Sequence, residues 1–305
     1  MSEVIQAKRY CQDGIVLQHS FRSMGGPCHL KLMDDSSEKI KRAFISAEAE
    51  CQRLNNKYSR FLEGSVLSQI NFGAGVIQNN IDKETIGLLN YALTCFEVSD
   101  GLFDITSGIL NRIWDFKNNK IPQQKVIDEY LPFIGLNYVE WGESSILLPK
   151  NMALDFGGIV KEYAVDRVKA ILISEGIQSG YIDFAGDISA IGPISGQSSI
   201  QVGVKDPQSP QDALATIPLT QQAIATSGSY ERFIDNNGEE FCHILNPITG
   251  WPVKYCSTVS VVADSCLVAG SMATTAMLKE QEAEAWLKQQ GAIYYMKANQ
   301  AHFVS

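Results

Sequence analysis

The sequence lacks several features that would place it in particular classes of protein. No apolar run approaches the roughly 20 residues needed to span a bilayer, and residues 1–10 contain no apolar core of signal-peptide length. The formal net charge is −9, from 25 basic and 34 acidic residues, without a run rich in lysine or arginine. An acidic chain without such a run is a poor candidate for binding nucleic acid or an anionic membrane.

Paired cysteines are also missing. The chain has 7 cysteines, an odd number, and they are scattered without any CxxC spacing. Most of them stand in apolar contexts, where cysteine behaves as a small hydrophobic residue. We therefore expect a reduced, cytoplasmic protein, with neither a signal peptide nor a lipoprotein leader in this chain. A secreted protein whose leader had been removed would have the same composition.

The chain can bury a substantial core, because 45% of its 305 residues are hydrophobic and 19% are charged. Apolar periodicity predicts helices over residues 37–58, 83–97 and 161–174, and Asp82 is the expected N-cap of the second helix. Strands are expected at residues 14–21, 29–33, 181–184, 199–204, 213–219, 257–263 and 292–297. This mixed order, without regular alternation of strands and helices, predicts a single α+β domain over residues 1–305.

Residues 152–166, MALDFGGIVKEYAVD, are the most informative segment for function. The pattern predicts the end of an apolar strand carrying Asp155, then a glycine pair, then a helix with Lys161 in its first turn. Gly157 and Gly158 lack a Cβ, so a ligand can approach the backbone closely. The helix start offers free N–H groups and the positive end of its dipole. These features together suit a phosphate-bearing ligand; the alternative is a turn followed by a surface lysine.

Three other segments combine polar side chains with turns. Tyr58 ends the first predicted helix beside hydroxyl and cationic groups, where it could stack on a ring, although docking into the core is the commoner role. Residues 99–108 place two carboxylates around a glycine turn, which is typical of turn capping. Residues 181–192 predict a strand with a bulge in its middle, where Asp187 serves either the bulge or a ligand.

Two segments in the last third of the chain carry further polar groups, following the hydroxyl-rich residues 225–233. Residues 242–250 place His243 on a predicted strand just before an Asn-Pro turn; a lone histidine is more often structural than functional. Residues 263–275 enter a helix and carry several hydroxyls, including Thr274. These hydroxyls could bind a ligand or bond back to the helix backbone.

In their order along the chain, these segments resemble the ApbE family, flavin transferases that cleave FAD and attach FMN to a threonine of a protein. The matches extend from about residue 20 to residue 280: Met24-Gly25, Tyr58-Ser59, 68–71, 101–106, 155–166, Gly186-Asp187, 226–228, 243–250 and 269–275. The resemblance implies an α+β, T-fold-like two-layer arrangement. It also implies that FAD lies in a cleft between the two halves.

The resemblance implies roles for individual residues. Positions that contact FAD correspond to Met24, Tyr58, Leu102, Phe103, Asp104, Asp155, Lys161 and Ile244. The Gly158 carbonyl and the Thr274 hydroxyl correspond to ligands of Mg²⁺, a cation that prefers oxygen and leaves positions open for diphosphate. Mg²⁺ and Lys161 would neutralise charge that develops as the pyrophosphate bond breaks and AMP leaves. A base near the phosphorus would activate the threonine hydroxyl, and His243 is the candidate.

The chain departs from the family pattern at three positions. Gly270 stands where an aspartate is common, four residues before the metal-binding threonine, and it has no side-chain oxygen. Losing that carboxylate should weaken Mg²⁺ binding unless Asp264 substitutes, and Gly270→Asp is then expected to tighten binding and raise FAD cleavage. Glu162 stands where glycine is common, and Asn246 stands where aspartate is frequent.

Three functional hypotheses follow. The first is an Mg²⁺-dependent FAD:protein FMN transferase acting on an acceptor protein that carries a target threonine, such as a flavinylated reductase subunit. The second is an FAD-binding protein that has lost its metal site and serves as a carrier, scaffold or regulator. The third is an FAD hydrolase that releases FMN and AMP. Measuring AMP release with and without an acceptor distinguishes the three: a transferase needs the acceptor, a hydrolase does not, and a binding protein releases no AMP.

Overall fold

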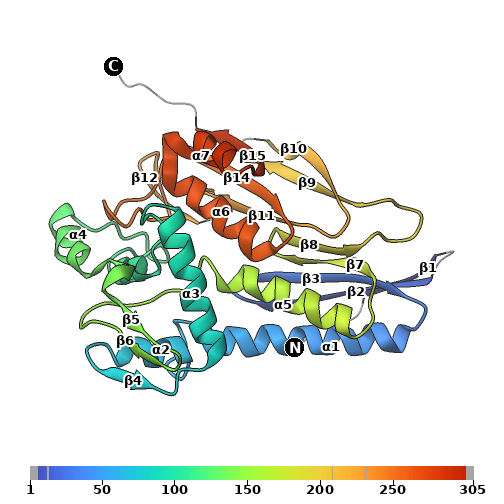
Figure 1. Cartoon of the computed structure of the whole chain (residues 1–305). Helices are drawn as coiled ribbons and strands as arrows, with labels where there is room; N and C mark the ends of the chain where they lie inside the picture. The colour runs from blue at the N-terminus through green and yellow to red at the C-terminus, as the bar shows by residue number, and fades with distance from the viewer. Residues whose placement is uncertain (1–5, 12–13, 208, 231, 300–305) are drawn as a thin grey trace.

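A computed structural model describes residues 6–11, 14–207, 209–230 and 232–299, and its centre is an 8-stranded sheet (Figure 1). Neighbouring strands pair antiparallel across the whole sheet. In spatial order the strands are β1 (Gln6–Cys11), β2 (Gly14–Ser23), β3 (Gly26–Asp34), β7 (Ser179–Phe184), β8 (Asp187–Gly192), β11 (Ala223–Gly228), β14 (Cys256–Ala263) and β15 (Ile293–Ala298).

Three helices cover one face of this sheet in the order of the strands beneath them. They are α1 (Ser37–Tyr58) over β2 and β3, α5 (Val160–Ser174) over β7 and β8, and α6 (Cys266–Lys279) over β11 and β14 (Figure 1). Side chains alternate along each strand, so Leu17 and Ala225 join the core under the helices while their neighbours Val16 and Ile224 join a second core on the other face. The hairpin of β9 (Ile200–Asp206) and β10 (Ser209–Leu219) covers that second face.

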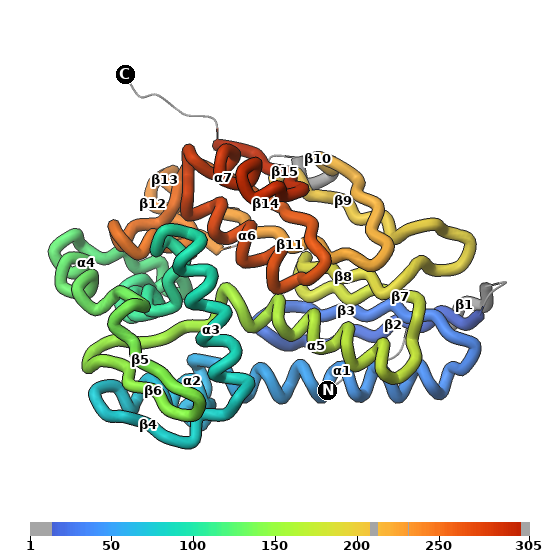
Figure 2. Tube along the Cα trace, viewed as in Figure 1, coloured from blue at the N-terminus to red at the C-terminus, as the bar shows by residue number. Residues whose placement is uncertain are grey.

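The chain between α1 and α5 forms a lobe at one end of these layers, drawn in cyan and green in Figure 2. It contains α2 (Val66–Phe72), α3 (Lys83–Val98), α4 (Gln124–Tyr130), the 3-10 helices η1 (Ile105–Arg112), η2 (Leu131–Phe133) and η3 (Leu136–Tyr138), and the small sheet of β4 (Ile77–Asn79), β6 (Ser145–Leu147) and β5 (Glu140–Trp141). The hairpin of β12 (Phe233–Asn236) and β13 (Glu239–Cys242) packs on this lobe through Ile234 and Phe241. Near the C-terminus, η4 (Glu280–Glu282) leads into α7 (Ala283–Gln289), which packs on α6.

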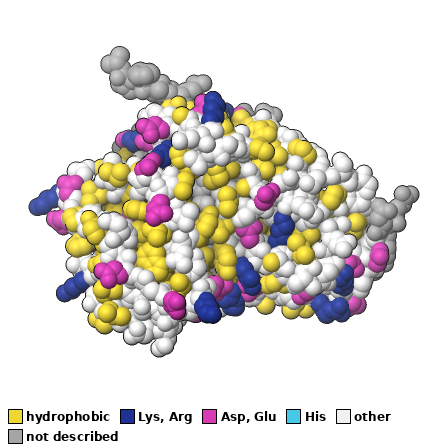
Figure 3. Space-filling view, in the orientation of Figure 1, with side chains coloured by type: hydrophobic (Ala, Val, Ile, Leu, Met, Phe, Trp, Pro, Cys, Tyr) yellow, Lys and Arg dark blue, Asp and Glu magenta, His cyan; other side chains and the backbone are white. Residues whose placement is uncertain are grey.

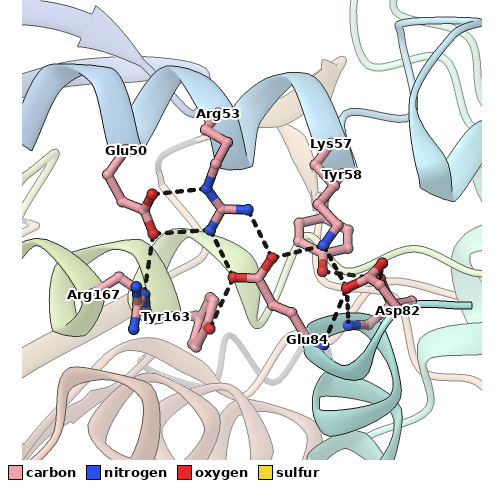
Figure 4. A network of polar contacts seen from close by, with 9 residues as sticks. Glu50, Arg53, Lys57, Tyr58, Asp82, Glu84, Tyr163 and Arg167 are labelled. Atoms are coloured by element: carbon pink, nitrogen blue, oxygen red, sulfur yellow. Dashed lines mark hydrogen bonds and ion pairs between the residues drawn. The ribbon is translucent and has the colours of Figure 1, made fainter.

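An ion-pair network joins α1, α3 and α5 where the lobe meets the layers (Figure 4). Arg53 of α1 lies 2.7 Å from both the Glu50 and the Glu84 carboxylates. Glu84 of α3 also contacts Lys57 at 2.7 Å and accepts a hydrogen bond of 3.1 Å from the Tyr163 hydroxyl of α5. The hydrogen bond from Arg53, opposed by partial burial and reinforced by Lys57, lowers the pKa of Glu84 to about 2.

The surface carries charges of both signs, as the composition leads one to expect. On the face shown in Figure 3, lysine and arginine side chains are interspersed with aspartate and glutamate, without a large patch of one sign. Across the described ranges, no helix combines the length and the apolar character needed to cross a membrane.

Most of the predicted elements are confirmed, and the α+β class with them. The helix predicted over residues 37–58 has those bounds, and the one predicted over residues 83–97 extends one residue further, with Asp82 accepting hydrogen bonds from Glu84 and Thr85 as its N-cap. The predicted end of a strand before Asp155 is wrong. That segment belongs to no strand, and the Leu154 backbone donates a hydrogen bond of 2.7 Å to the Asn71 side chain.

The bulged strand predicted over residues 181–192 is also wrong. The segment forms two strands, β7 and β8, which pair with each other through a tight turn. Ala185 and Gly186 in this turn both have positive φ, 54° and 98°, the backbone of a two-residue hairpin whose twist matches that of the strands. The turn brings Asp187 to the first position of β8, at the end of the sheet.

We expect Glu84→Ala to lower the free energy of unfolding by about 1–2 kcal/mol, after allowance for solvent screening, because it leaves Arg53 and Lys57 without a shared carboxylate. This difference between the wild type and the variant should shrink as the pH falls from 4.5 through 2. The Glu84 carboxylate keeps its charge to about pH 2 in the folded protein, whereas in the unfolded chain it is already protonated below pH 4.5. Urea unfolding between pH 2 and pH 7 measures both effects. The matched control is Glu284→Ala, which removes an exposed pair with Lys288 on α7; an equal loss in this control would contradict a special role for the network.

Candidate functional site

Two tight turns lie side by side at the end of the sheet nearest the lobe. The β2–β3 turn contains Met24, whose φ of 52° is uncommon for a residue other than glycine. It neighbours the β7–β8 turn, since a Cβ added at Gly26 would lie 2.8 Å from the Cβ of Ala185. Met24 is partly buried and packs on the core beneath the helices. The predicted flavin contact Met24 is therefore held in a defined position at this end.

A buried charged cluster lies beside these turns, between α5 and β8. The Lys161 ammonium is 2.7 Å from the Asp187 carboxylate and 4.0 Å from the Glu162 carboxylate. Asp187 also accepts a hydrogen bond of 3.2 Å from the Thr226 backbone of β11. Burial, and next the charge of Asp187, raise the pKa of Glu162, while Lys161 opposes them. Glu162 Oε2 is buried and has no hydrogen-bond partner among the residues that the structure describes.

Gly270 of α6 faces this cluster. A Cβ at position 270 would lie 2.4 Å from Cγ of Glu162, a distance that real Cβ atoms do not tolerate. The space that an aspartate would need is therefore occupied by the Glu162 side chain. For Gly270→Asp alone to complete a metal site, the Glu162 side chain would first have to move, and the expected gain in binding stays a prediction.

Asp264 lies outside the helix that carries Gly270 and Thr274, because it precedes Ser265, the N-cap of α6. The carboxylate that acts at this helix end is Asp166 of α5, which accepts hydrogen bonds from the Ser265 hydroxyl at 2.7 Å and the Cys266 backbone at 2.9 Å. Asp166 therefore binds the start of α6 to α5.

The other predicted metal ligands supply neutral oxygens. Thr274 of α6 forms a hydroxyl–hydroxyl hydrogen bond of 2.9 Å with Ser227 of β11. Gly158 precedes α5 and lies beside Phe103, whose ring would be 3.4 Å from an added Cβ. No group of three histidine, cysteine, aspartate or glutamate side chains in the described part of the chain could hold a metal ion. Carboxylate, hydroxyl and carbonyl oxygens together nevertheless match the donor type that Mg²⁺ prefers, with further positions for water or phosphate.

The loop that carries His243 is anchored to the lobe. Trp114 of the lobe donates a hydrogen bond of 2.9 Å to the Gly250 carbonyl. The Asn246 side chain accepts hydrogen bonds from the Ile248 and Thr249 backbones at 2.8 and 3.2 Å, which is an Asx turn. An aspartate oxygen could accept the same bonds, so the departure from the family pattern at Asn246 leaves this turn intact.

His243 follows β13 directly, and its ring is held in one orientation. Nδ1 lies 3.2 Å from the Arg232 carbonyl oxygen. A carbonyl only accepts, so this contact requires a proton on Nδ1 and leaves the lone pair on Nε2. Burial lowers the pKa of His243 to about 4; the carbonyl contact opposes this shift, and the positive charges of Arg232 and Lys161 reinforce it. The imidazole is therefore neutral near pH 7.

A second polar group lies where the lobe leads into α5. The Asp155 carboxylate is paired with the Arg60 guanidinium and accepts hydrogen bonds from the Asn111 side chain at 3.1 Å and the Gly157 backbone at 2.8 Å. Asp155 thus orients the glycine pair before α5. The sequence singled out both segments, but nothing in it indicated the pairing of Arg60 with Asp155, which are separated by about a third of the chain.

Two predicted flavin contacts have structural roles. Tyr58 is buried in the core and shares a hydrogen bond of 3.1 Å with the Thr85 hydroxyl. Asp104 is buried and accepts hydrogen bonds from the Thr106 backbone at 2.7 Å and the Leu136 backbone at 3.0 Å, while burial raises its pKa. The contacts match the commoner alternatives, an aromatic docked into the core and a turn cap, and the contacts of Tyr58 and Asp104 with FAD stay predictions.

The remaining predicted flavin contacts are apolar. Phe103 is buried, while Leu102 and Ile244 are partly buried and pack against the same cluster under α6. A surface hollow of about 510 Å³ lies elsewhere on the lobe, lined by residues such as Phe133, Tyr138 and Lys150, and it contains none of the predicted site residues. We therefore locate the candidate site by its convergent polar groups, at the end of the sheet.

We expect His243→Gln to reduce the loss of stability that the protein shows on acidification. The folded pKa of about 4 lies below the unfolded value of 6.5, so the unfolded state binds the proton first. The contribution of the neutral imidazole is complete above pH 6.5 and is lost as the pH falls through 4, by about 1–3 kcal/mol. Urea unfolding at several pH values from 4 to 8 measures it. Parallel pH profiles for the variant and the wild type would contradict the assignment.

The chain is similar to known proteins along most of its length. The ApbE family model matches residues 24–296. Relatives named FAD:protein FMN transferase include one from Haemophilus influenzae, 26% identical and covering 85% of this chain and 79% of the relative, and one from Chlamydia muridarum, 30% identical and covering 79% and 77%.

Solved structures extend this similarity to the fold. The ApbE protein from Thermotoga maritima has a TM-score of 0.85 at 26% identity, covering 94% of this chain and 97% of that chain. The apo form of the Pseudomonas stutzeri flavinyl transferase ApbE also has a TM-score of 0.85, covering 96% and 94%, and at 22% identity it supports the fold alone. The family match and the architecture agree, and the chain belongs to the ApbE family.

Proposed function

We propose that this chain is an FAD:protein FMN transferase. The observation that carries the proposal is that, in a member of the ApbE family, Lys161 pairs with Asp187 at the start of β8 while Thr274 bonds to Ser227 near the end of the neighbouring β11. In the reaction, a threonine oxygen of the acceptor bonds to the phosphorus on the FMN side of FAD. The bond from this phosphorus to the bridging oxygen breaks, AMP leaves with that oxygen, and the threonine proton passes to a base.

His243 is suited to accept that proton. Its Nε2 carries the lone pair, and the lowered pKa of about 4 keeps the ring neutral near pH 7. A neutral imidazole can take a proton from a hydroxyl that is losing it to a new bond. It follows β13, and the positive charge of Lys161, which would bind the diphosphate, is among the charges that lower its pKa.

Lys161 and the oxygen ligands are suited to the diphosphate. The Lys161 side chain is partly exposed, and its pairing with Asp187 directs the ammonium toward the end of the sheet. Mg²⁺, when bound by the Thr274 hydroxyl, the Gly158 carbonyl and nearby carboxylate oxygen, would supply positive charge to the phosphate oxygens. FAD would then lie between the end of the sheet and the lobe, with Met24, Leu102 and Ile244 on its apolar parts.

The test is to incubate the pure chain with FAD and Mg²⁺, with and without acceptor domains that the relatives named FAD:protein FMN transferase modify. We expect AMP release that depends on the acceptor, together with a covalent FMN adduct on an acceptor threonine in the mass spectrum. Equal AMP release without acceptor would identify a hydrolase. Tight FAD binding without AMP release would identify a binding protein, and either result would overturn the proposal.

We expect Lys161→Ala to weaken binding of FAD by about 1.5–3 kcal/mol, and to weaken riboflavin binding much less, because the ammonium acts on phosphate and not on the flavin ring. The dissociation constants for FAD and riboflavin are measured by fluorescence titration. Their ratio corrects for any general disturbance of the site that follows when Asp187 loses its partner, because such a disturbance would affect both ligands. Lys161→Arg keeps the charge and serves as the control. An equal loss for both ligands in Lys161→Ala would place the lysine away from the diphosphate.

A further inference from the structure

The Glu162 carboxyl group is buried and its hydrogen bonding is incomplete. It projects from the first turn of α5 with only 7% of the residue exposed, and Oε2 contacts no hydrogen-bond donor in the described residues. Its other oxygen is 4.0 Å from the Lys161 ammonium, too far for a hydrogen bond. A buried carboxylate oxygen without a partner is costly, so this atom is suited to bind a group that the chain itself does not supply.

Gly270 makes the position of Glu162 possible. A Cβ on Gly270 would lie 2.4 Å from Cγ, 3.1 Å from Cδ and 3.2 Å from Oε1 of Glu162. Glycine is unfavourable inside a helix, so its presence in the middle of α6 calls for a reason of packing. Here the reason is that the Glu162 carboxylate occupies the volume that a side chain at position 270 would fill. The two departures from the family pattern, Glu162 and Gly270, therefore meet in space.

The cluster around Glu162 contains two carboxyl groups but only one ammonium group, and this excess of acidic groups favours binding of a cation. Glu162 and Asp187 are neighbouring carboxyl groups, and the charge of Asp187 adds to burial in raising the pKa of Glu162, while Lys161 is the cation paired with Asp187 at 2.7 Å. Thr274 lies one helical turn after Gly270 on the same face of α6. Its hydroxyl, bonded to Ser227 at 2.9 Å, adds a neutral oxygen on this face of α6.

We propose that Glu162 is a ligand of the divalent cation, so that the carboxylate of this metal site is carried by α5 and not by α6. Gly270 clears the space, and Glu162 Oε2 binds the cation together with the Thr274 hydroxyl. The inference rests on the proposed function for the identity of the cation as Mg²⁺. Oxygen ligands of this kind also accept Mn²⁺, which serves as a paramagnetic probe.

The test exchanges the carboxylate between the two helices. Binding of Mg²⁺ alone is measured by calorimetry, and binding of Mn²⁺ alone by electron paramagnetic resonance, for the full chain and for Glu162→Gln, Glu162→Gly, Gly270→Asp and the double variant Glu162→Gly/Gly270→Asp. We expect Glu162→Gln and Glu162→Gly to weaken binding on the order of tenfold to a hundredfold. The double variant should recover most of the loss, because it restores a carboxylate one turn before Thr274. Gly270→Asp alone should lower the melting temperature, because it overfills the space.

Glu175→Gln is the matched control, since it removes a carboxylate from the other end of α5 and should leave metal binding unchanged. Wild-type affinity in Glu162→Gln, or no detectable binding in the wild type, would overturn the inference. If the double variant does not fold, the comparison of Glu162→Gln with the wild type still decides. Transfer of FMN is measured separately, so that the two proposals can fail independently. If the wild type transfers FMN and Glu162→Gln binds the metal normally, the metal-ligand inference is refuted and the proposed function stands. If Glu162→Gln loses metal binding but the wild type releases no AMP, the proposed function is refuted and the metal-ligand inference stands.

Discussion

The close packing of α5 against α6 is the constraint on which the rest of the site depends. Asp166 of α5 binds the start of α6 through the Ser265 hydroxyl and the Cys266 backbone, and this fixes the two helices in register. One turn earlier on α5, the Glu162 side chain enters the space beside Gly270. The same turn of α5 directs Lys161 to Asp187 at the start of β8. A single helix turn thus positions a carboxyl group and an ammonium group at the end of the sheet.

The lobe contributes to the site because it is tied to these layers by polar contacts as well as by its own core. The network around Glu84 joins the lobe to α1 and α5. The pairing of Asp155 with Arg60 holds the glycine pair that leads into α5. Trp114 anchors the loop that carries His243. Movement of the lobe relative to the sheet would therefore displace the imidazole and the start of α5 together.

The departures from the family pattern differ in their physical meaning. Asn246 replaces one acceptor by another and preserves an Asx turn. Glu162 and Gly270 are a coupled pair, because a side chain at either position excludes one at the other. Gly270 alone suggests a lost metal ligand, whereas its contact with the Glu162 side chain supports the proposal that α5 supplies the carboxylate.

The sequence by itself determined the α+β class, the bounds of α1 and α3, the N-cap at Asp82 and the family, since all of these depend on local periodicity, capping chemistry or ordered segments. It also selected Lys161, His243 and Thr274, whose types suit phosphate, proton transfer and a hard cation. It could not show that the side chains of Tyr58 and Asp104 are buried, because exposed and buried forms of such side chains occupy the same kinds of segment.

Only the tertiary structure decided what meets across the fold. The pairing of Arg60 with Asp155, the approach of Glu162 to Gly270 and the hairpin that sets Asp187 at the start of β8 all join segments that are distant along the chain or separated by a turn of ambiguous pattern. Local patterns carry no information on which side chain fills a given volume between two helices. That volume is determined by the helix packing, and the packing is decided by the whole core at once.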